Sequence, residues 1–191
     1  ETEVKSIGNS AFMSCSNLTS LEIAGGETPL KIGDSVFYYC GLKAVTLPDR
    51  VTELGKEAFK SCAELESVKL GANLSKVGSE AFGNCKKLTE LSIDDANTAF
   101  VLDGNCFIDK AAKKVIMGFD NSVIPTDGSV TAIGGKAFAN CEFTEFTIPA
   151  QITSIENEAF RWCANLINIT LPAEITAVPD WVFANCTSLE S

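Results

Sequence analysis

The stretch that decides the fold is AFKSCAELESVKL, residues 58–70. It begins with the phrase Phe-x-x-Cys, which ends at Cys62, and continues with Leu65, Val68 and Leu70 at apolar-x-x-apolar-x-apolar spacing. The last two apolar positions alternate with polar ones, as a strand that is buried on one face requires. The phrase occurs seven times, at residues 12–15, 37–40, 59–62, 82–85, 138–141, 160–163 and 183–186. This recurrence predicts a chain built from one repeated unit.

The spacing of the phrase sets the size of the unit. Successive phenylalanines are 25, 22, 23, 56, 22 and 23 residues apart, and leucine-rich repeats have periods of roughly 20–29 residues. A second apolar pair follows each strand, for example Val51 and Leu54. We predict a strand, a turn, a short extended segment and then a helical or 3₁₀ turn that carries Ala-Phe-x-x-Cys. One unit cannot bury its own apolar face, so we expect stacked neighbours and one column of phenylalanines.

The phrase, the strand pattern and the prolines that end strands, Pro48, Pro149 and Pro172, resemble the BspA-like class of bacterial surface leucine-rich repeats over residues 4–190. The resemblance implies an α/β repeat solenoid, a right-handed leucine-rich-repeat coil with short strands on its concave face and 3₁₀ or short helical turns. It also implies a surface or secreted bacterial protein, often host-associated, whose array serves adhesion or protein binding. No catalytic residue belongs to that family pattern.

One unit departs from the pattern. Within residues 97–129, residues 100–108 and 114–119 read as strands around a polar connection at residues 109–113, which predicts an inserted β-hairpin. With this irregular unit and about seven regular repeats, we predict a single leucine-rich-repeat domain over residues 1–191. Because the sequence begins at Glu1 and stops at Ser191, inside a further unit, we expect it to be a piece of a longer chain.

Charge and hydropathy bear on the partners. A net charge of −10 argues against nucleic acid, which is bound mainly through basic residues. No apolar run approaches the roughly 20 residues that cross a bilayer, so we expect no membrane insertion by this segment.

The residues offer little for catalysis, metals or cofactors. The chain has no histidine and no Cys-x-x-Cys, and seven of its eight cysteines belong to the repeated phrase. We therefore predict small, buried apolar cysteines, no enzyme, no cofactor and no metal. Stacked equivalent cysteines would lie about 4.8 Å apart with parallel side chains, which disfavours disulfides. A calcium site stays open as an alternative because several oxygen ligands cluster in the irregular unit: Asp94, Asp95, Asp103, Asn105 and Asp109.

The outward positions of the strands are the predicted binding surface, although simple solvation explains them equally well. They form two columns of mostly small polar side chains, on the concave face, that belong to Ser20, Glu22, Thr46, Ser67, Lys69, Glu90, Ser92, Glu145, Thr147, Asn168 and Thr170. These columns contain no aromatic or arginine anchor of the kind that dominates interface energetics. The candidate exposed anchors are Tyr38, Tyr39, Trp162 and Trp181, whose burial the sequence does not decide; we favour packing into the solenoid edge.

These features and the resemblance predict an extracellular or cell-surface module that contacts a host protein, a matrix component or another bacterial surface molecule through the solenoid surface. A structural spacer that presents another domain is the alternative. A carbohydrate-binding module is a third hypothesis, and it would require exposed aromatics beside carboxylates, which the strand columns lack.

Overall fold

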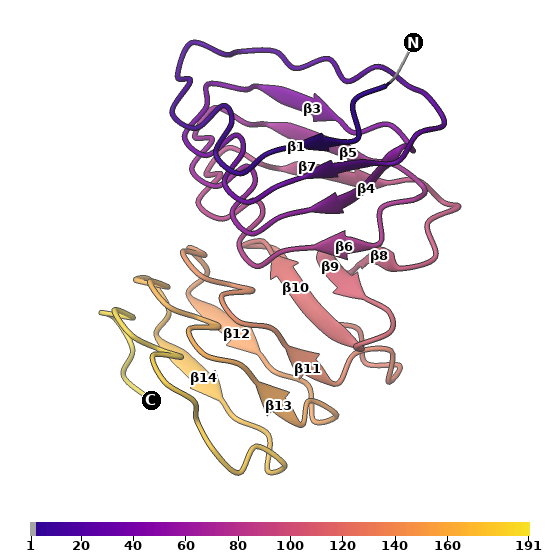
Figure 1. The fold of residues 1–191 in the computed structure, drawn as a ribbon. Helices are drawn as coiled ribbons and strands as arrows, with labels where there is room; N and C mark the ends of the chain where they lie inside the picture. Colours follow the sequence, from indigo (N-terminus) through magenta and orange to yellow (C-terminus); the bar gives the residue numbers. More distant parts are fainter. Residues whose placement is uncertain (1–2) are drawn as a thin grey trace. The chain divides into compact units, whose positions relative to one another are not determined.

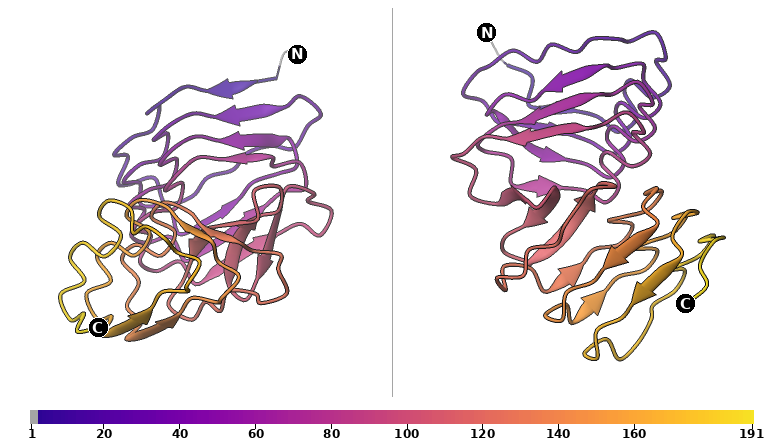
Figure 2. Two further views of the ribbon diagram at one scale, coloured as in Figure 1. Left: turned by 90° about the horizontal axis from the view of Figure 1, so that it is seen from below. Right: turned by 180° about the vertical axis from the view of Figure 1, so that it is seen from behind.

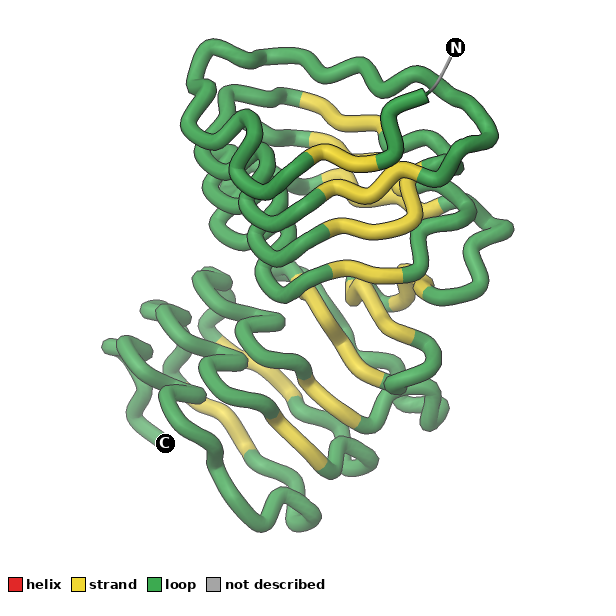
Figure 3. The backbone as a smooth tube through the Cα atoms, in the orientation of Figure 1, coloured by secondary structure: helices red, strands yellow, loops and turns green. Residues whose placement is uncertain are grey.

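The computed structural model describes residues 3–191 as stacked coils whose regular elements are short β-strands (Figure 1). No helix occurs anywhere along the described chain (Figure 3). The chain forms two compact units, one that ends at Ala99 and one that runs from Phe100 to Ser191.

The first unit contains two parallel sheets, which Figure 2 shows from two further sides. One has the order β1-β2-β4-β6, with β1 Ser6–Ile7, β2 Leu30–Ile32, β4 Val51–Leu54 and β6 Lys76–Val77. The other has the order β3-β5-β7, with β3 Ala44–Thr46, β5 Ser67–Leu70 and β7 Glu90–Ile93. Neighbouring strands come from successive coils, as the predicted repeat requires.

The second unit begins with the irregular repeat. Its larger sheet has the order β13-β11-β10-β9-β8, with β8 Phe100–Asp103, β9 Cys106–Asp109, β10 Lys114–Gly118, β11 Ala132–Ile133 and β13 Ser154–Ile155. Strands β8, β9 and β10 pair antiparallel, and the regular coils then join β10 in parallel. A second sheet pairs β12 Glu145–Thr147 with β14 Asn168–Thr170.

The predicted hairpin is present around residues 109–113, but the prediction of one strand over residues 100–108 is wrong. A tight turn divides that stretch into β8 and β9. Gly104 and Asn105 both have positive φ, 54° and 56°. Two successive residues of this kind form the turn that suits two antiparallel strands, and Gly and Asn are the residues that tolerate it.

The predicted helical or 3₁₀ turn around Ala-Phe-x-x-Cys is not found, because only every second amide bonds within the turn. In the coil of Phe37, the amides of Tyr38 and Cys40 donate to carbonyls three residues back, at 3.2 and 3.3 Å. The amides of Ser35, Phe37 and Tyr39 donate instead to carbonyls of the next coil, at 2.7–2.9 Å. The turn therefore joins neighbouring coils through its own backbone.

The amides of a turn alternate between bonds within the turn and bonds to the next coil because two residues of the turn have positive φ. One lies two positions before the phenylalanine and the other two positions after it. All seven turns show it, with φ between 53° and 66°. The positions hold Ser10, Ser14, Ser35, Tyr39, Glu57, Ser61, Glu80, Asn84, Lys136, Asn140, Glu158, Trp162, Trp181 and Asn185. Eleven of these fourteen residues are polar and three are aromatic.

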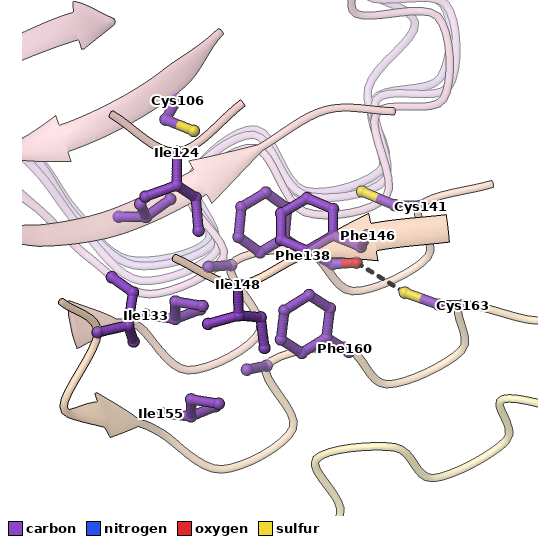
Figure 4. Close-up of a cluster of buried hydrophobic side chains, with 14 of the residues drawn as sticks. Cys106, Ile124, Ile133, Phe138, Cys141, Phe146, Ile148, Ile155, Phe160 and Cys163 are labelled. Carbon is purple, nitrogen blue, oxygen red and sulfur yellow. Dashed lines mark hydrogen bonds between the residues drawn. The ribbon is translucent and has the colours of Figure 1, made fainter. Parts of the chain in front are cut away.

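The phenylalanines of the turns stack within each unit. In the first unit, ring centroids are 5.4 Å apart for Phe12 and Phe37, and 5.0 Å apart for Phe37 and Phe59. In the second unit, Phe138 stacks on Phe160 at 5.3 Å (Figure 4). The predicted column is thus found separately in each unit, and most of its rings are part of the buried core.

Candidate functional site

The predicted binding columns of the first unit lie on strands β3, β5 and β7. Their register places Thr46 beside Lys69 and Lys69 beside Ser92, while Ser67 lies beside Glu90. All but the half-buried Ser67 are exposed, because they alternate with the buried residues of the same strands. The side chains therefore form two columns on one sheet face, as predicted.

Ser20 and Glu22 are exposed, but they lie in a segment without strand structure. One backbone bond ties this segment to the next coil, from the amide of Lys43 to the carbonyl of Thr19, 3.3 Å away. These two residues thus extend the surface without belonging to its sheet.

The remaining predicted residues form a separate set in the second unit. Glu145 pairs in register with Asn168, and Thr147 with Thr170, on strands β12 and β14. All four side chains are exposed. Strand β7 pairs with β5, and β12 pairs with β14, so the predicted residues lie on two sheets.

On the other sheet of the first unit, charged side chains of neighbouring strands form ion pairs, whereas, among the described residues, those of the strand columns do not. Nζ of Lys31 lies 2.7 Å and Nζ of Lys76 3.7 Å from Oε1 of Glu53. The bond from Lys31 is the main reason that the pKa of Glu53 falls below its ordinary value. No ion pair within residues 3–191 engages Lys69 or Glu90. The two columns therefore present charges that are not already neutralised by a neighbour.

The acids of the irregular unit form turns. The carboxylate of Asp94 accepts a hydrogen bond from the amide of Ala96 at 3.0 Å, and that of Asp109 from the amide of Ala112 at 2.9 Å. Among the described residues, no group of three or more His, Cys, Asp or Glu side chains could hold a metal ion. The calcium alternative therefore has no ligand cluster to support it.

The prediction of buried cysteines is wrong for Cys15, in the first coil, and is confirmed for most of the others. Six are buried, Cys186 is partly buried, Cys15 is exposed, and all eight are free. Burial raises the pKa of Cys62 to about 11 and that of Cys85 to about 12. These thiols keep their protons at neutral pH, which makes them poor nucleophiles.

Three of the candidate anchors are exposed on the side of the units that the Ala-Phe-x-x-Cys turns form, which we call the turn edge. Tyr39, Trp162 and Trp181 are 59%, 51% and 66% exposed, so the expectation that they pack into the edge is wrong, whereas Tyr38 is half-buried. All three residues have positive φ, and their exposed side chains lie away from the buried phenylalanine column. The sequence contained a signal for this, because the equivalent positions of the other turns hold polar residues.

No helix within residues 3–191 could cross a membrane. A search among proteins of curated function found no significant match.

Solved structures share the fold. A leucine-rich-repeat protein of Eubacterium ventriosum matches with a TM-score of 0.78 and 20% identity, over 97% of this chain and 56% of its own. A leucine-rich cell surface protein of Faecalibacterium prausnitzii matches with a TM-score of 0.70 and 25% identity, over 98% and 56%. The pneumococcal vaccine antigen PcpA matches with a TM-score of 0.68 and 17% identity, over 89% and 49%. This chain therefore spans about half the length of these similar chains.

A family model covers the entire sequence. The BspA-type leucine-rich-repeat region matches in six copies over residues 1–114 and 114–191. The strand register, the phenylalanine stacks and this match agree on one conclusion. The chain belongs to the BspA-type leucine-rich-repeat family.

Proposed function

We propose that this chain is a binding module of a bacterial cell surface and that it contacts a protein or another macromolecule of a host through the outward side chains of its strands. The main support for this proposal is the pair of exposed columns on β3, β5 and β7. Their charged residues Lys69 and Glu90 have no ion-pair partner among the described residues. An unpaired, exposed charge is available to a partner without first breaking an existing ion pair.

The surface location rests on the family and on a similar protein. Leucine-rich repeats of this family are generally binding modules. The similar chain of Faecalibacterium prausnitzii is described as a leucine-rich cell surface protein. We extend that location, outside the cell or on its surface, to this chain.

The strand columns suit recognition by polar contacts. The parallel ladders fix the backbone of each column, and Val45 and Val68 anchor it to the core. A partner would therefore meet hydroxyl groups at regular spacing, with a lysine and a glutamate among them. Such charges affect the rate and specificity of association more than its affinity.

The test is binding of the chain to a panel of extracellular-matrix proteins and mucins by surface plasmon resonance. The variant carries Glu90→Lys, Glu145→Lys and Asn168→Lys, which reverse or add charge on both sets of strands. We expect at least tenfold weaker binding of the partner. The matched control is Ser154→Lys, which changes an exposed residue of β13 outside the columns.

The control variant should bind as the unchanged chain does. If the triple variant binds equally well, the strand face is not the binding surface. If no member of the panel binds the unchanged chain, the proposal fails and the alternative, a structural spacer that presents another domain, is favoured.

A further inference from the structure

The two tryptophans of the chain lie on adjacent coils at the turn edge of the second unit. Trp162 and Trp181 are 51% and 66% exposed. Both have positive φ, 66° and 62°. Large aromatic residues seldom adopt this conformation, which Asn and other small polar residues tolerate better. The needs of the turn therefore do not account for tryptophan at either position.

One arginine contacts both tryptophans. Cζ of Arg161 lies 5.7 Å from the ring centroid of Trp162 and 5.7 Å from that of Trp181. Its Nη1 also donates a hydrogen bond to Oε2 of Glu158. A guanidinium over an aromatic face is attracted to it. The two rings are thus held in place before any ligand arrives, which lowers the entropic cost of binding.

The first unit contains the equivalent site without tryptophan. Lys60 holds the position of the arginine, and its Nζ lies 3.0 Å from Glu57 and 2.7 Å from Glu80. Glu57 occupies the position of Glu158, and Glu80 that of Trp181. This turn therefore joins two coils by a cation between two carboxylates. In the second unit, one of those carboxylates is replaced by an exposed aromatic ring.

The surroundings of the rings are polar. Asn140 and Asn185 occupy the position of Trp162 in the two neighbouring coils, and both are exposed. Nζ of Lys136 lies 3.6 Å from Oε2 of Glu158, next to the arginine. Tryptophan and arginine are also common at the centres of protein interfaces, but lysine and glutamate, which this cluster contains as Lys136 and Glu158, are depleted there. Aromatic rings set among amides and charged groups suit a ligand that is apolar on one face and polar along its edge.

We propose that Trp162 and Trp181 form a binding site for a neutral glycan, with the face of a pyranose ring against an indole ring. The C–H groups on that face carry partial positive charge and meet the negative face of the aromatic system. The hydroxyl groups at the edge of the sugar can donate to and accept from the amides of Asn140 and Asn185. This site lies on the turn edge and does not depend on the function proposed for the strand face.

The test uses the intrinsic fluorescence of the chain. Because these are the only tryptophans, indole emission reports on this site alone. The probes are hexasaccharides of β-linked glucose, of β-linked N-acetylglucosamine and of α-linked mannose. We expect a saturable change in emission with at least one of them, and calorimetry then gives its affinity.

Two variants copy residues that the repeat already accepts. Trp181→Glu recreates the arrangement around Lys60, and Trp162→Asn copies the neighbouring coils, so both should fold normally. Each should weaken the binding of the hexasaccharide at least tenfold by calorimetry. The matched control is Tyr39→Asn, which removes an exposed aromatic from the same turn position in the first unit and should leave the affinity unchanged.

The proposal is overturned if no hexasaccharide changes the emission, or if both tryptophan variants bind as tightly as the unchanged chain. It is also overturned if the tryptophan variants lose a protein partner while no hexasaccharide binds. Asn168→Lys, on the strand face, should leave glycan binding intact. Loss of glycan binding and loss of strand-face binding can therefore be told apart.

Discussion

The thiol of Cys62 donates a hydrogen bond to the carbonyl oxygen of Phe37, 3.1 Å away in the preceding coil. The same bond at the same length joins four further pairs: Cys40 to Phe12, Cys85 to Phe59, Cys163 to Phe138 and Cys186 to Phe160. A carbonyl beside the phenylalanine column thus receives a donor that an alanine or valine could not supply. The repeated cysteine is therefore a hydrogen-bonding link between coils as well as a small core residue.

Cys62→Val should test this link, because valine fills a similar volume but has no donor. We expect the free energy of unfolding to fall by about 0.5–1.5 kcal/mol, the net contribution of one hydrogen bond, because the carbonyl oxygen of Phe37 still accepts from the amide of Cys40. Urea unfolding measures it. Cys15→Val, in the first coil where the thiol is exposed, should change it by no more than about 0.5 kcal/mol. Equal stability of Cys62→Val and the unchanged chain would show that the bond contributes nothing.

Alkaline solution should destabilise the protein. Burial raises the pKa of Cys62 to about 11 and that of Cys163 to about 12, from an ordinary value of 9.0. Above pH 9.0 the unfolded chain releases thiol protons that the native protein keeps, so the free energy of unfolding falls as pH rises through these values. Below that pH both states keep the protons, and these thiols add no pH dependence.

The urea midpoint should therefore show no thiol-dependent change up to about pH 9 and should fall above it. Other groups also titrate in this range, so the comparison is with a variant in which Cys62 and Cys163 are both valine. Its midpoint should fall less steeply above pH 9. Identical slopes for the two chains would contradict the assignment.

Thiol accessibility should separate one cysteine from the rest. Cys15 is exposed, whereas six others are buried. With a chromogenic disulfide reagent at pH 8, we expect one fast reaction in the native protein, and Cys15→Ser should abolish it. In urea without reductant, all eight thiols should react. A total below eight would reveal a disulfide that contradicts the free cysteines of the structure.

Gly118 should be intolerant of a side chain. A Cβ there would lie 2.0 Å from Cε1 of Phe138, whose ring is fully buried. The amide of Gly118 donates to the carbonyl of Ala137 in the next coil. In the regular coils, the amide of the turn phenylalanine makes the equivalent bond, as Phe37 does to Ala58. We expect Gly118→Ala to destabilise the protein by about 1–3 kcal/mol, as overpacking does.

The control for that change is Gly25→Ala, where an added Cβ would meet nothing within 4 Å. Its urea midpoint should match that of the unchanged chain. If Gly118→Ala is equally harmless, the ring of Phe138 can move aside, and the close packing against Gly118 does not limit stability.

The sequence alone predicted the features that depend on local periodicity. The alternation around Val68 located strand β5, and the same apolar spacing in the preceding repeat, with Val45 equivalent to Val68, gave the register of Thr46 beside Lys69. Each repeat has one phenylalanine at the same place, so stacked repeats were expected to stack their rings, as Phe37 and Phe59 do.

Other features depend on contacts between neighbouring coils, and the sequence of one repeat does not predict them. The turns are not helical because amides such as that of Ser35 bond to the next coil, at Lys56, rather than along the chain. The same geometry directs Trp162 and Trp181 outward, so their exposure follows from the turn and not from their hydrophobicity. Ser20 lies outside any strand, and one backbone bond at the neighbouring Thr19 ties its segment to the next coil.

The central claim, that the strand face binds a partner, is tested most directly by lysine acetylation with mass spectrometry in the presence of a partner from the panel. Lys69 projects from β5 on the proposed face, whereas Lys76 lies on β6 of the other sheet, with 72% of its side chain exposed. We predict that the partner slows acetylation of Lys69 at least fivefold and leaves that of Lys76 unchanged. Protection of Lys76 with Lys69 still reactive would contradict the account.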